Sequence, residues 1–130
     1  MSPEDNLIYE SWKAKNLNAS MKLYFDVGLG DGVKPPAALD QNMIRGWLYN
    51  TQKRADLVVD TGEECWIVEF RFEASSNAIG RLLMYRKLYL QDPIFKYPLK
   101  LILVSNRYDN DLAGLAQDTK IESYGVISDQ

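Results

Sequence analysis

Helical spacing and strand-like alternation of apolar residues follow one another along the whole chain. The first residues place Leu7, Ile8 and Trp12 at helical spacing, and Ser2 or Asp5 can cap that helix. The predicted elements, in chain order, are a helix from Pro3 toward Met21, a strand over Leu23–Val27, a short helix within Ala37–Asn50, strands over Arg54–Asp60 and Glu64–Phe72, a helix over Ser75–Leu90, a strand over Leu99–Ser105, a short helix over Asp109–Ala116 and a last strand over Ile121–Ile127.

This order of elements predicts an α/β fold. The strands Arg54–Asp60 and Glu64–Phe72 are separated by the turn Thr61–Glu63 and form a hairpin. The later strands alternate with helices, and the mostly apolar run Leu99–Ser105 is typical of a strand covered on both faces. We therefore expect one domain over residues 1–130, with a mixed sheet of about four to five strands flanked by helices.

Two acidic residues stand out on the predicted hairpin. Side chains two apart on a strand share a face, so Asp56 is expected to point with Val58, opposite Ala55 and Leu57. Glu69 lies in an otherwise apolar stretch, where a carboxylate is costly unless a partner neutralises it. If the hairpin brings the two acids together, they need a metal ion or an arginine between them to stay ionised.

Composition removes several classes of chemistry. The chain has no histidine and one cysteine, which excludes Ser-His-Asp and Cys-His catalysis, histidine-ligated zinc and internal disulfides. Its net charge is −3, from 15 basic and 18 acidic residues, whereas a general nucleic-acid coat is strongly basic. Any chemistry must use carboxylates, lysine, arginine, tyrosine or a hard cation such as Mg²⁺.

The ends and apolar runs of the sequence bear on its location. No apolar run approaches the roughly 18 residues of a membrane span. The first ten residues are acidic and polar, unlike a signal peptide. We expect a cytoplasmic protein with no membrane partner.

The region 54–90 resembles the core of the PD-(D/E)XK nuclease superfamily. Its sequence reads RADLVVD, then WIVEFRFE, then AIGRLLMY. In that family an Asp on one strand and a Glu-x-Lys on the next hold Mg²⁺, the lysine assists the attacking water, and the following helix carries Gln-x-x-x-Tyr. The resemblance implies a restriction-endonuclease-like core, with Asp56 and Glu69 as ligands of Mg²⁺ or Mn²⁺ and the Phe70 carbonyl as a third ligand.

Two further positions depart from the family pattern, and two others match it. Arg71 stands where the lysine is expected, and Arg81 stands where the helix glutamine is expected, while Tyr85 matches the tyrosine. Glu10 in the first helix is a candidate for the acid that many members place there. Arginine stays protonated and cannot act as a base, although it can orient water or stabilise developing charge.

The sequence leaves two functions open. The resemblance implies a Mg²⁺-dependent endonuclease, with Asp56, Glu69, Arg71 and Glu10 as catalytic residues and DNA contacted by a group of basic and aromatic side chains. Those substrate-binding candidates are Lys53, Arg54, Arg81 and Tyr85.

The alternative is an inactive nuclease fold that binds protein subunits of a larger assembly, such as a phage particle, where the location would be the virion. An Arg71 guanidinium between the two carboxylates would favour the inactive fold, and an open acidic pocket would favour a metal site. A DNA-binding module without cleavage would need a contiguous basic patch. For either function we expect a homo-oligomer.

Overall fold

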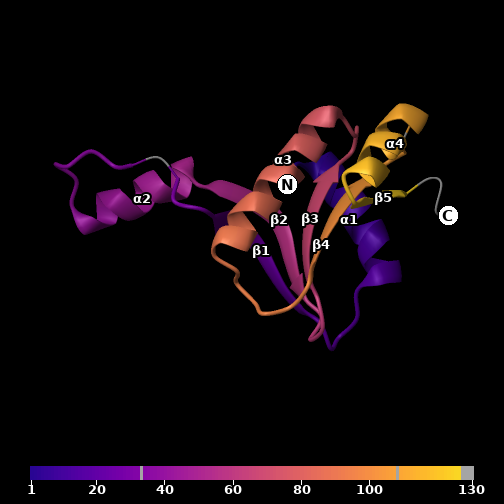
Figure 1. Cartoon of the computed structure of the whole chain (residues 1–130), viewed down its shortest axis with the longest axis horizontal. Coiled ribbons are helices and arrows are strands. Elements are labelled where there is room, and N and C mark those ends of the chain that lie inside the picture. Colours follow the sequence, from indigo (N-terminus) through magenta and orange to yellow (C-terminus); the bar gives the residue numbers. More distant parts are fainter. Residues whose placement is uncertain (33, 108, 127–130) are drawn as a thin grey trace.

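The computed structural model describes residues 1–32, 34–107 and 109–126 (Figure 1). Within them helices and strands follow the predicted order. The helices are α1 (Pro3–Asn16), α2 (Gln41–Thr51), α3 (Ser76–Gln91) and α4 (Asn110–Asp118). The strands are β1 (Lys22–Leu29), β2 (Lys53–Asp60), β3 (Cys65–Arg71), β4 (Leu99–Ser105) and β5 (Ile121–Gly125).

The five strands form one mixed sheet in the order β1-β2-β3-β4-β5. β1, β2 and β3 pair antiparallel, and β3, β4 and β5 pair parallel. The parallel strands are joined by α3 and α4, as parallel connections require. The predicted α/β class with a mixed sheet and flanking helices is therefore confirmed.

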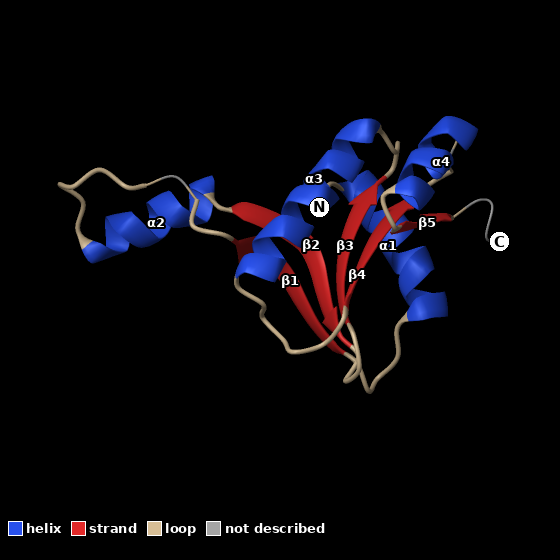
Figure 2. Cartoon of the chain, viewed as in Figure 1, coloured by secondary structure: helices blue, strands red, loops and turns tan. Residues whose placement is uncertain are grey.

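Helices cover both faces of the sheet (Figure 2). On one face α3 and α4 pack on a core that includes Ile67, Leu82 and Leu103. On the other face α1 places Ile8 and Trp12 against Leu57, Phe70 and further sheet residues. β4 contributes to both cores, which is why its sequence reads as a nearly continuous apolar run.

Local sequence explains where the helices begin. The Ser2 hydroxyl caps α1 by accepting a hydrogen bond from the Asp5 backbone amide, and Pro3 occupies the first turn. Asp40 caps α2 and Asp109 caps α4 in the same way, through the amides of Met43 and Leu112. The Ser75 side chain makes no such bond at α3.

One segment stands apart from the sandwich. Residues 30–32 and 34–52, which we call the α2 arm, extend away from the sheet and carry α2 back toward it (Figure 1). None of the described side chains of α2 is buried. No helix in the described part of the chain is long and apolar enough to cross a membrane.

Three predicted details differ from the structure. The first helix, predicted from Pro3 toward Met21, ends at Asn16. β1 continues two residues beyond Val27, to Leu29, and the chain turns at Gly30 and Gly32, which have φ of +73° and +70°. The predicted alternation also fails at the start of β2, because Ala55 packs in the same core as Val58. The end predicted for the last strand, Ile127, lies outside the described residues.

Candidate functional site

The failure of alternation in β2 marks the place where β2 and β3 separate. Their ladder pairs Leu57 with Val68 and does not continue to Asp56 and Glu69. There the side chains replace the backbone pairing. The Asp56 amide donates to Glu69 Oε1 at 3.2 Å, and the Phe70 amide donates to Asp56 Oδ2 at 3.0 Å. Each carboxylate therefore accepts a hydrogen bond from the backbone of the opposite strand.

The neighbouring strand β1 is distorted at the same level. Asp26 lies between the pairs Phe25–Leu57 and Val27–Ala55, and its φ is +53°, an uncommon conformation for a residue other than glycine. The sheet is therefore irregular next to Asp56 in its pairing with both β1 and β3. Between β2 and β3, hydrogen bonds to the carboxylates of Asp56 and Glu69 take the place of the backbone ladder.

The Arg71 guanidinium lies between the two carboxylates. Its Nη1 is 2.9 Å from Asp56 Oδ2 and 2.7 Å from the Phe70 carbonyl oxygen, and its Nη2 is 2.6 Å from Glu69 Oε2. The Glu69 side chain is fully buried, and its Oε2 accepts no hydrogen bond of good geometry, so Arg71 neutralises it by charge. Arg71 thus contacts all three groups that the family resemblance implies as metal ligands.

Helix α3 supports this cluster from one side. Arg81 Nε lies 3.6 Å from Glu69 Oε2, and Arg81 Nη2 donates to the Tyr85 hydroxyl at 2.7 Å. The Tyr85 hydroxyl donates in turn to the Arg54 carbonyl at 2.8 Å. Arg81 and Tyr85, one helical turn apart, therefore connect α3 to both β2 and Glu69.

Burial and charge shift the acid–base behaviour of the cluster. Burial raises the pKa of the Glu69 carboxyl, and the charge of Asp56 raises it further, against the opposing effect of Arg71. Burial alone would lower the pKa of Arg71, but Glu69 and Asp56 outweigh it, so the pKa of Arg71 is raised. Burial also raises the pKa of Tyr85, and the Glu69 charge adds to this shift.

The donor set does not fit a divalent cation as it is arranged. Asp56 Oδ2, Glu69 Oε2 and the Phe70 carbonyl face the guanidinium. The charges of Arg71 and Arg81 oppose those of the two carboxylates, which weakens their attraction for Mg²⁺. Among the described residues, no group of three acidic, histidine or cysteine side chains could hold a metal ion.

The first helix places a different acid at the site from the one predicted. Glu10 is exposed, and helical geometry puts it on the side of α1 opposite Ile8 and Trp12, away from the sheet. Asp5 instead accepts the Phe72 amide at 2.8 Å, and its charge acts on Arg71. Sequence reasoning used Asp5 only as a cap, although it shares the sheet-facing side of the helix.

The predicted DNA-contacting cations occupy two settings within the described residues. Lys53 and Arg81 line a cavity of about 430 Å³, together with Tyr85 and Met84. Arg54 turns away from it and donates to the backbone of Tyr49 and Asp26. For a DNA-binding module, Lys53 and Arg81 would share one cavity, whereas the Arg54 side chain is hydrogen-bonded to the backbone of other residues.

Comparisons with known proteins add no assignment. The chain matched no protein-family model, no curated protein and no solved structure. The fold and the site geometry thus carry the functional argument by themselves.

Proposed function

We propose that this chain is a PD-(D/E)XK-like domain that does not cleave nucleic acid and serves as a structural or adaptor module in a larger assembly. The observation that carries this proposal is the position of Arg71. Its guanidinium contacts Asp56, Glu69 and the Phe70 carbonyl, the three groups that would surround a metal in an active relative.

The way the carboxylates are used supports the same proposal. Asp56 and Glu69 accept backbone amides where β2 and β3 separate, so they perform a structural task that needs no metal. Arginine remains charged at every physiological pH, which makes it a permanent counter-ion for the pair. It also cannot act as a base, whereas the family lysine assists the attacking water. An assembly such as a phage particle is one setting for such a module.

A second candidate, Mg²⁺-dependent cleavage of DNA, is favoured by one observation. Arg81, which lies 3.6 Å from Glu69 Oε2, lines a cavity together with Lys53, where a phosphate backbone could lie. This candidate requires Arg71 to leave the carboxylates. Its side chain is 29% exposed, so a path toward solvent exists.

Metal binding and plasmid nicking separate the two candidates. Calorimetric titration with MgCl₂ and MnCl₂ is expected to give no binding to the native chain at millimolar metal, and supercoiled plasmid is expected to stay intact. Glu69→Ala serves as the site variant and Glu63→Ala, in the exposed hairpin turn, as the matched control. Metal binding and nicking by the native chain and the control, both lost in Glu69→Ala, would overturn the proposal in favour of the nuclease.

A further inference from the structure

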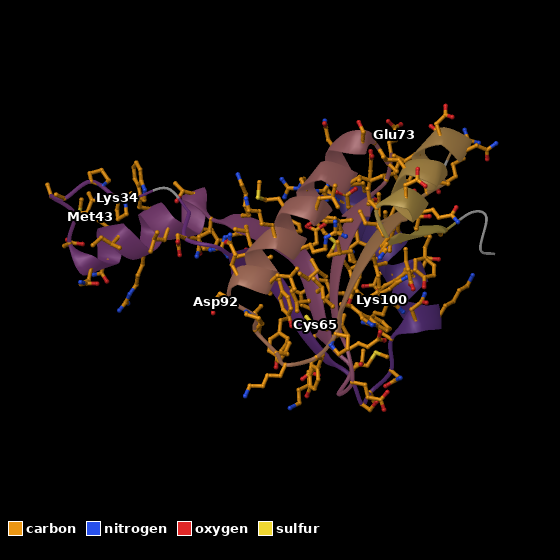
Figure 3. All side chains as sticks on the ribbon, viewed as in Figure 1. Lys34, Met43, Cys65, Glu73, Asp92 and Lys100 are labelled. Atoms are coloured by element: carbon orange, nitrogen blue, oxygen red, sulfur yellow. The ribbon has the colours of Figure 1, made fainter. Side chains whose placement is uncertain are left out.

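The α2 arm exposes an amphipathic helix to solvent. Met43 is 51% exposed, and Ile44 and Leu48, which share a helix face, are only half-buried. Met43 lies near the far end of the arm and away from the sheet, as does Lys34 (Figure 3). A helix with this pattern normally buries its apolar face, and among the described residues this face is only partly covered, with Met43 left exposed.

Hydrogen bonds and a cation–π contact attach the base of the α2 arm to β1 and β2. The Tyr49 hydroxyl donates to Asp26 Oδ2 at 2.8 Å, and Arg54 Nε donates to the Tyr49 carbonyl at 2.9 Å. The Arg54 guanidinium also lies 3.7 Å from the centre of the Tyr49 ring. A projecting element fixed in this way loses little conformational freedom when it binds.

A groove runs along α3 beside the base of the arm. It consists of three adjoining cavities, of about 430, 310 and 400 Å³. The first two share Lys53 and Met84, and the last two share Leu88. We call it the α3 groove. Its middle cavity combines the apolar side chains Leu29, Met84 and Leu88 with Asp31 and Lys53, and its first cavity carries the cations Lys53 and Arg81.

The arm and the groove complement each other across a two-fold axis. α2 begins at the far end of the arm and ends at Thr51, which itself lines the groove. Two copies with antiparallel α2 helices would therefore place the far end of each arm at the base of the other. Asp40, the exposed acidic cap at the far end, then faces Lys53 in the partner's groove.

The geometry points to a symmetric dimer in which the α2 helix of each copy occupies the α3 groove of the other. α2 has 11 residues and is about 16 Å long. The two-fold axis doubles this contact, because each copy supplies one helix and one groove. The dimer does not depend on whether the Arg71 site is inactive.

Analytical ultracentrifugation of the full chain over a range of concentrations tests this dimer. The native chain is expected to sediment as a dimer. Met43→Glu on the arm and Met84→Glu in the groove are each expected to raise the dissociation constant about tenfold or more. Leu7→Glu, at a 67% exposed leucine of α1, makes the same chemical change outside both surfaces and is expected to leave the dimer intact.

A charge exchange tests the antiparallel arrangement itself. Asp40→Lys and Lys53→Glu each place like charges at both contacts of a homodimer and are expected to weaken it. Mixing the two variants is expected to restore a heterodimer, because one contact is native and the other has its charges exchanged.

Several results would overturn the dimer. They are a native chain that is monomeric at every concentration, a dimer insensitive to Met43→Glu, an equal loss in Leu7→Glu, species that keep growing with concentration, or no recovery on mixing.

Discussion

Removing the guanidinium between the two carboxylates is the most direct perturbation of the site. In Arg71→Ala, Glu69 keeps its fully buried carboxylate without a counter-ion at 2.6 Å, and Asp56 loses its partner at 2.9 Å. Breaking a buried ion pair on one side typically costs about 3–5 kcal/mol. Asp56 is 16% and Arg71 29% exposed, so water screens part of the interaction, and we expect a loss near the lower end, about 3 kcal/mol.

Chemical denaturation followed by tryptophan fluorescence measures this loss. Trp12 is buried and lies against Phe70, so its emission reports on the core next to the site. Lys87→Ala removes an exposed cation of α3 and is the matched control. Because the variant removes the cation nearest to Glu69 and leaves only the more distant contact with Arg81, the deficit should be largest at alkaline pH and shrink as Glu69 becomes protonated.

The same variant tests whether the guanidinium stands in a metal position. With Arg71 removed, Asp56, Glu69 and the Phe70 carbonyl form an oxygen cluster that keeps only the longer contact between Arg81 and Glu69, and millimolar Mg²⁺ should raise the midpoint of unfolding. The native chain and Lys87→Ala should show no such rise. A loss within about 0.5 kcal/mol, typical of an ordinary surface substitution, would refute the reasoning, as would a deficit that does not change with pH.

Three other predictions concern the supports of the site. The pKa of Glu69 is raised above its ordinary 4.5, so the native state binds more protons than the unfolded state. The Glu69 contribution to stability therefore falls as pH rises from 4.5 through the raised pKa. The free energy of unfolding of Glu69→Gln, measured against pH, should lack this fall. Identical pH profiles for the native chain and the variant would contradict the prediction. Tyr85→Phe removes the 2.8 Å hydrogen bond to the Arg54 carbonyl and should lower the free energy of unfolding by about 1–2 kcal/mol, whereas an unchanged value would show that water replaces the hydroxyl. Gly30→Ala should lower the melting temperature, because Gly30 has φ +73° and an added Cβ would lie 2.8 Å from the Leu88 side chain of α3. Gly80→Ala should raise it, because Gly80 lies in a helix with open space around an added Cβ. The opposite order would be inconsistent with the described turn.

The order and class of the elements could be predicted because the apolar pattern changes period at each of them. The run Leu99–Ser105 required a strand buried on both faces, and the structure places it between two helical layers. The irregularity at Asp56 could not be predicted from a strict period of two. It depends on hydrogen bonds between Asp56, Glu69 and Phe70, residues that are thirteen and fourteen positions apart and come together only in the folded sheet.

The choice of acid from the first helix shows a second limit. Sequence reasoning selected Glu10 by its residue type, whereas the packing of α1 is set by Ile8 and Trp12, which turn Glu10 away. Asp5 lies on the sheet-facing side and reaches the Phe72 amide. A helical projection of the apolar face would have favoured Asp5, because the buried positions fix the rotation of the helix.

The same carboxylates can serve a metal site or a strand junction, and the third charged residue decides between them. A lysine at position 71 would present one compact cation with free rotation, which can yield its place to a metal. Arginine has a planar fork, and here that fork spans Asp56 on one strand and Glu69 on the other while also reaching the Phe70 carbonyl. The arginine thereby links the two strands and occupies the position between the oxygens that a divalent cation would need.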